Sequence, residues 1–165
     1  LLGPEMRSTG EVMGWDRDFA TAFLKAQMGA GVHLPDEGTV FLSIKDTDKT
    51  DQLVETARIL IELGLSIVAT SGTHSFLAEN GIESTLVNKV YEPGRNVVDV
   101  MKDGGVDLVM NTTEGAQAVE DSRAMRSVAL YGKIPYFTTL SGSHAAALAM
   151  QARRTGDLVV RPLQA

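Results

Sequence analysis

From about residue 39 onward, short apolar runs alternate with longer segments whose apolar residues recur at helical spacing. Polar or glycine-containing turns follow the apolar runs, a pattern typical of buried strands. The expected strands are 40–44, 65–69, 83–87, 106–110 and 134–138. The expected helices begin after Asp48, after the turn at 70–73, near Val97, near Val119 and at Ser143. In the first of these helices, the residues expected on the buried face are Leu53, Ala57, Leu60 and Ile61, before Gly64 ends the helix.

Strands that are separated by helices need crossover connections, which produce a parallel sheet with helices on both faces. We therefore expect an α/β fold of three layers around a five-stranded parallel sheet. Open sheets of this kind bind their ligands at the carboxyl ends of the strands.

The first 35 residues lack this alternation. Residues 1–14 show little periodicity, Asp16 is expected to cap a helix from about Arg17 to Met28, and residues 34–38 have turn-forming composition. We expect residues 1–35 to be the end of a preceding domain with its linker, and residues 36–165 to form the α/β domain. Because the first residue is not methionine, we expect a fragment of something longer.

Composition narrows the possible partners. The chain has 165 residues, 44% of them hydrophobic, which suffices for one domain with a real core plus a leader. The net charge of −6 argues against a nucleic-acid surface, because a polyphosphate partner needs a basic stripe. The sequence has no cysteine and shows no membrane span or signal peptide, which fits a cytoplasmic protein.

The stretch Thr70-Ser71-Gly72-Thr73 lies where a predicted strand ends and a helix begins. The first N–H groups of a helix have no intrahelical partner and lie at the positive end of its dipole, and glycine lets a ligand approach the backbone. These features favour an anion, with phosphate as the first ligand to consider. The alternative is that Thr70 or Ser71 only caps the helix and Gly72 only turns the chain.

Polar residues follow each predicted strand, at 43–49, 70–73, 88–89, 111–113 and 138–139. Because parallel strands end at one edge of the sheet, these turns should form a single rim. Lys49 and Lys89 would supply positive charge there, hydroxyl groups would supply donors, and Asn111 could contact a base, sugar or carbonyl. We therefore favour a phosphate-bearing ligand at this rim.

The rim offers little evidence of catalysis. The sequence has no nucleophile elbow, Walker loop or dinucleotide fingerprint, and its histidines have no partner at metal-ligand spacing. The acids and bases that could lie at the rim are Asp46, Asp48, Asp121 and His74. We expect His74 to be a surface residue and Asp121 to have a capping or ion-pair role.

Five motifs in order along the chain resemble a known family. They occupy residues 42–49, 69–73, 86–90, 111–113 with 120–122, and 136–140. They are similar to the C-terminal regulatory domain of the carbamoyl-phosphate synthase large chain, which has the methylglyoxal-synthase-like fold. The leader at 6–14 also resembles the end of the ATP-grasp domain that precedes it in that family.

The resemblance implies allosteric control of a glutamine-hydrolysing, cytoplasmic ligase that makes carbamoyl phosphate for pyrimidines and arginine. The implied partners are a nucleoside monophosphate effector (UMP, an inhibitor, or IMP), the preceding ATP-grasp domains and the small glutamine amidotransferase subunit, within an oligomer formed through the intact enzyme. It implies ATP, magnesium and potassium in the intact large chain, and neither a cofactor nor a catalytic residue in this fragment.

Carried over by motif, the effector would be held by Ser43, Lys49, Thr70, Thr73, Lys89, Asn111, Thr113 and Asp121. The phosphate would lie at residues 70–73 with Lys49, although one extra residue separates Lys49 from Gly64 relative to the family pattern. The resemblance also implies a second effector region, for ornithine in enteric members, at Tyr136 and Thr138. Phe137 stands where those members have an acidic residue, so an amine ligand would lose its counter-charge here.

Three other functions are compatible with parts of this pattern. A free-standing methylglyoxal synthase shares the fold and eliminates phosphate from dihydroxyacetone phosphate, but it needs a carboxylate base and a histidine at the rim, where this chain has Asn111. An IMP cyclohydrolase-type domain matches fewer motifs. A dimerisation or scaffold domain would bind no nucleotide.

Overall fold

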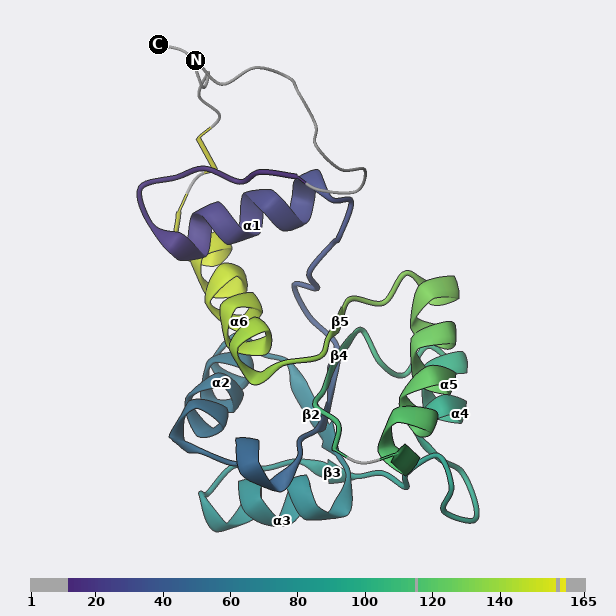
Figure 1. Cartoon of the computed structure of the whole chain (residues 1–165). Helices are drawn as coiled ribbons and strands as arrows, with labels where there is room; N and C mark the ends of the chain where they lie inside the picture. Colours follow the sequence, from purple (N-terminus) through teal and green to yellow (C-terminus); the bar gives the residue numbers. More distant parts are fainter. Residues whose placement is uncertain (1–11, 115, 157, 160–165) are drawn as a thin grey trace.

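Five parallel strands form one sheet in the order β3-β2-β1-β4-β5 (Figure 1). The strands are β1 (Thr39–Ser43), β2 (Ser66–Ala69), β3 (Thr85–Leu86), β4 (Leu108–Asn111) and β5 (Tyr136–Phe137). The structure is a computed structural model, which describes residues 12–114, 116–156 and 158–159. The expected five-stranded parallel sheet is confirmed, but β3 and β5 are shorter than predicted because each lies at an edge and pairs on one side only.

Helices cover both faces of the sheet, which confirms the three-layer α/β fold. The helices are α1 (Phe19–Gly29), α2 (Asp51–Glu62), α3 (Ser71–Glu79), α4 (Val97–Lys102), α5 (Ala116–Gly132) and α6 (Leu140–Thr155). In Figure 1, α2 and α6 lie on one side of the sheet, with α1 packed on α6, and α4 and α5 lie on the other side.

The central strand β1 divides the core into two parts. Val40 and Leu42 pack among residues of α2 and α6, whereas Phe41 packs with Val97 of α4 and Met125 of α5. All five side chains are at most 4% exposed. Alternate residues of β1 are therefore buried on opposite faces, which is why its sequence is continuously apolar.

Two predicted helix caps are wrong, and α5 and α6 each begin three residues before their predicted starts. Asp18, not Asp16, caps α1 by accepting a hydrogen bond from the N–H of Thr21, and Asp16 instead pairs with Lys25 at 2.6 Å. Asp48 does not cap α2, because Asp46–Asp48 form a separate 3-10 turn.

The α2 helix follows its predicted face except at one position. Leu53, Ala57 and Leu60 are fully buried, but Ile61 is 42% exposed because it lies at the border of the apolar stripe. Gly64 follows the helix with a φ of +86°, a left-handed conformation that favours glycine.

The segment before the sheet is fastened to the last helix. Arg153 of α6 donates hydrogen bonds to the carbonyls of Leu34 and Pro35, at 2.9 and 3.0 Å, and pairs with Asp36. The Phe23 ring of α1 lies 6.5 Å from the ring of Phe137 in β5. The predicted domain boundary at residue 35 thus lies in a tethered segment, and it stays a prediction.

No helix in the described part of the chain is long and apolar enough to cross a membrane.

Candidate functional site

Strand register brings three polar residues level at the carboxyl edge of the sheet. Ser43 of β1 pairs with Asn111 of β4, and Leu42 pairs with Ala69 of β2, so that Thr70 follows at the level of Ser43. The hydroxyl groups of Thr70 and Ser43 are 3.4 Å apart. These residues form the middle of the rim that the strand ends predicted.

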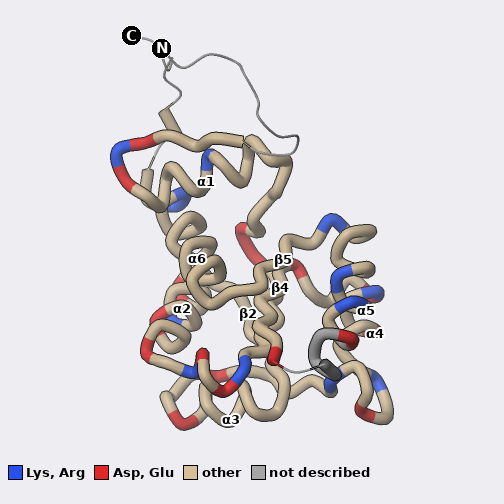
Figure 2. The backbone as a smooth tube through the Cα atoms, viewed as in Figure 1, with Lys and Arg blue, Asp and Glu red and all other residues tan. Residues whose placement is uncertain are grey.

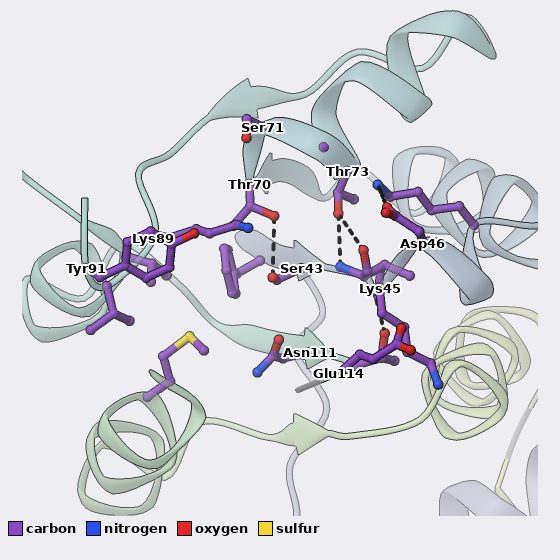
Figure 3. A pocket seen from close by; sticks show the side chains of 18 residues that line it. Ser43, Lys45, Asp46, Thr70, Ser71, Thr73, Lys89, Tyr91, Asn111 and Glu114 are labelled. Carbon is purple, nitrogen blue, oxygen red and sulfur yellow. Dashed lines mark hydrogen bonds and ion pairs between the residues drawn. The ribbon is translucent and has the colours of Figure 1, made fainter. Parts of the chain in front are cut away.

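A cavity of about 570 Å³ opens at this rim (Figure 3). Six of the eight predicted effector-binding residues line it, namely Ser43, Lys49, Thr70, Thr73, Lys89 and Asn111. Apolar side chains line another part of its wall, from Phe41, Val90, Val97 and Met125. The cavity thus combines groups suited to a phosphate with apolar surface suited to a flat ring.

The positive part of the cavity is the N-terminus of α3. Thr70 precedes this helix but makes no side-chain capping bond, so its hydroxyl does not use the first N–H groups. The ammonium of Lys49 lies directly above, since a Cβ built on Gly72 would come within 2.9 Å of Nζ. A lysine and a helix N-terminus here favour the same anion.

Lys49 also pairs with Asp46 of the 3-10 turn, at 2.6 Å between Nζ and Oδ1. The hydrogen bond and charge of Lys49 lower the pKa of Asp46, and the charge of Lys89 lowers it further. Figure 2 shows acidic and basic residues close together in the segment between β1 and α2. The cavity wall therefore contains an ionised carboxylate beside its lysine.

Thr73 has a structural role that its motif did not suggest. Its side chain is 1% exposed, and its hydroxyl accepts a hydrogen bond from the N–H of Ile44 at 2.9 Å. The same hydroxyl donates to the Ile44 carbonyl at 3.4 Å. Thr73 thus fastens α3 to the end of β1.

We expect replacement of Thr73 by valine to lower the free energy of unfolding by about 1–3 kcal/mol, because it leaves the buried N–H of Ile44 unpaired. Urea unfolding measures this difference. Replacement by serine, which keeps the hydroxyl, should lower the free energy of unfolding by a clearly smaller amount. A Thr73→Val variant as stable as the unchanged chain would show that the hydrogen bond contributes nothing to stability.

Lys89 approaches the cavity from the loop after β3. In Figure 3 its side chain extends toward Thr70. Its ammonium lies 5.9 Å from the centre of the Tyr91 ring, and its backbone N–H donates to the carboxylate of Glu92 at 2.8 Å. The loop and the ring thus hold Lys89 near the positive part of the cavity.

Asn111 is oriented by Tyr136, a residue that the sequence analysis placed in the second effector region. Its side chain is 3% exposed, and Nδ2 donates to the hydroxyl of Tyr136 at 2.7 Å. The same hydroxyl lies 3.2 Å from Oγ of Ser122. Tyr136, predicted in a second effector region, therefore orients Asn111 at the cavity, whereas Thr138 lies exposed beyond β5.

The remaining predicted residues are not placed on the cavity wall. Thr113 is half-buried and does not line the cavity. The side chain of Asp121 lies outside the described residues. His74 lines a separate groove, and its Nδ1 lies 2.8 Å from Oγ of Ser84.

Sequence reasoning did not single out Lys45, Tyr91 and Glu114, whose side chains also belong to the wall. Their places in loops just after strands β1, β3 and β4 were the available signal. Among the described residues, no group of three or more His, Cys, Asp or Glu side chains could hold a metal ion.

The fold and site together define the class of this protein: a parallel α/β domain with a lysine-lined cavity at the carboxyl edge of its sheet. A model of the MGS-like domain family matches residues 52–138, and the chain belongs to that family. This confirms the resemblance found in the sequence motifs. The crystal structure of ForH superposes with a TM-score of 0.50 at 16% identity, covering 71% of this chain and 90% of that one, and supports the fold alone.

The chain is similar to several proteins named carbamoyl phosphate synthase large chain. The chain is 52% identical to the carbamoyl phosphate synthase large chain of Rhizobium meliloti and 54% identical to that of Mesorhizobium japonicum, in each case over 99% of this chain. It spans only 14% of the length of either protein. It is also 46% identical to the C-terminal section of the large chain from Methanocaldococcus jannaschii, over 99% of this chain and 26% of that protein.

Proposed function

We propose that this chain is the allosteric regulatory domain of a glutamine-hydrolysing carbamoyl phosphate synthase and that it binds UMP or IMP in the cavity at the carboxyl edge of the sheet. The observation that carries the proposal is the position of the Lys49 ammonium over Gly72, at the N-terminus of α3. The identity to large chains over nearly the whole chain supports the enzyme assignment.

Different parts of the cavity wall would hold the phosphate, the base and the sugar of a nucleotide. The phosphate would lie between Lys49, Lys89 and the first N–H groups of α3. The base would lie toward the apolar surface of Phe41, Val97 and Met125. Asn111 would contact a polar edge of the sugar or base, in the orientation that Tyr136 sets.

In the intact enzyme the chemistry would take place elsewhere. We propose that the preceding ATP-grasp domains and the small amidotransferase subunit are its partners in an oligomeric, cytoplasmic enzyme. ATP, magnesium and potassium would be bound by the other domains of the large chain. A nucleotide would act by binding two states of the enzyme with different affinity, which requires a change in how this domain packs.

Calorimetric titration with UMP and IMP tests the proposal. We expect binding of at least one nucleotide, no binding of uridine at the same concentrations, and about tenfold weaker binding after replacement of Lys89 by alanine, because a charge-assisted contact is lost. Lys102 at the end of α4, an exposed lysine away from the cavity, gives the matched control. Absence of nucleotide binding would contradict the proposal.

Turnover of dihydroxyacetone phosphate is measured on the same preparation. A methylglyoxal synthase needs a histidine at the rim, but His74 lies in the other groove. We therefore expect no turnover. Turnover without nucleotide binding would instead identify a phosphate-eliminating lyase.

A further inference from the structure

The ion pair between Lys49 and Asp46 lies in the cavity, where both side chains line the wall. The two partners differ strongly in their surroundings. The side chain of Lys49 is 15% exposed, whereas that of Asp46 is 92% exposed. The lysine is therefore held in place by the fold, and the aspartate reaches it from the solvent side.

The carboxylate of Asp46 binds the same ammonium that would bind a phosphate. Nζ lies over Gly72, at the N-terminus of α3, so its approach to the helix marks the place of an anion. A phosphate in contact with this ammonium would lie within a few ångströms of Asp46, and like charges at such a distance repel each other.

Asp46 remains charged in this position. Its pKa is lowered first by the hydrogen bond with Lys49, then by the charge of Lys49, and also by the charge of Lys89. Both lysines that would receive the phosphate thus already interact with this carboxylate. The two anions would compete for one pair of cations.

We propose that Asp46 acts as an internal competitor of the nucleotide phosphate, which must displace it from Lys49. This inference rests on the proposed function and adds a determinant of its affinity. Displacement needs little rearrangement, because the exposed carboxylate can rotate into solvent while the 3-10 turn keeps its backbone hydrogen bond from the N–H of Lys49 to the carbonyl of Asp46. Asp46 therefore lowers the affinity of the site for phosphate.

A neighbouring residue provides a matched control. Asp51, the first residue of α2, is exposed and does not line the cavity. Asp51→Asn changes the net charge by the same amount as Asp46→Asn, without freeing Lys49 or Lys45, the other lysine of this segment in the cavity wall.

The experiment is calorimetric titration of the chain and of both variants with UMP, with uridine as the ligand that lacks a phosphate. We expect Asp46→Asn to bind UMP about five- to tenfold more tightly than the unchanged chain, because a repelling charge is removed. Asp51→Asn should differ from the unchanged chain by less than about twofold. Uridine should bind no better to either variant. Thermal unfolding of Asp46→Asn should match that of the unchanged chain, since the side chain is exposed.

The outcomes separate this inference from the proposed function. If the unchanged chain binds UMP but Asp46→Asn binds it equally or more weakly, Asp46 does not compete and the inference is wrong, while the proposed function stands. An equal gain in both variants would indicate a general charge effect and would also overturn it. If neither the unchanged chain nor Asp46→Asn binds UMP or IMP, both proposals fail.

Discussion

Replacing Lys49 with methionine is expected to weaken UMP binding about 30- to 100-fold, the largest effect of any single change in the cavity. The Lys49 side chain is mostly buried and its ammonium lies at the N-terminus of α3, where a charge-assisted contact is stronger than on an open surface. The substitution also leaves the carboxylate of Asp46 without its partner, so that it would repel the phosphate. Isothermal titration of the two proteins measures the ratio.

Lys102→Met is the control for loss of a positive charge and should bind UMP almost as the unchanged chain does. The double variant with Asp46→Asn should recover part of the affinity lost in Lys49→Met, because the repelling carboxylate is gone. Affinity that stays within about threefold after removal of Lys49 would place the phosphate elsewhere in the cavity.

Replacing Phe41 with alanine is expected to lower the free energy of unfolding by about 3–5 kcal/mol. Phe41 is 1% exposed in the central strand, where it packs with Val97 and Met125 between the sheet and the helices α4 and α5. Truncation would remove buried apolar surface and leave a cavity that these helices can only partly close. Urea unfolding followed by circular dichroism measures the difference.

Phe41→Leu provides the comparison, since it keeps most of the apolar volume. It should lower the free energy of unfolding by less than about half as much as Phe41→Ala. Because Phe41 also lines the candidate site, Phe41→Ala should enlarge the apolar end of the cavity. A loss below about 1 kcal/mol would show that this face of β1 is less tightly packed than the structure indicates.

The sheet and the rim could be predicted because they follow from repeating local patterns. Apolar runs such as 40–44 and 106–110 correspond to β1 and β4 within two residues. Once the strands are parallel, Ser43, Thr70 and Asn111 must end at one edge. The position of this rim therefore needed no knowledge of side-chain contacts.

Contacts between side chains could not be predicted in the same way. The bond between Asn111 and Tyr136 joins residues 25 positions apart, and it depends on β4 and β5 being neighbours in the sheet. Asp16 was wrongly predicted as the cap of α1, because Asp18 is an equally suitable residue and only the helix start decides between them. The use of the Thr73 hydroxyl by Ile44 likewise appears only when α3 meets the end of β1.

The short strand β5 connects two regions of the molecule through adjacent residues. Tyr136 bonds to Asn111 at the cavity, and Phe137 contacts Phe23 of α1 on the opposite face of the sheet. Because consecutive side chains of a strand point in opposite directions, a displacement of this strand by a bound ligand would move both contacts at once. Because β5 has only two residues, a shift of Tyr136 would also shift Phe137. A ligand bound in the cavity would thereby change the packing of α1, the helix that precedes the sheet.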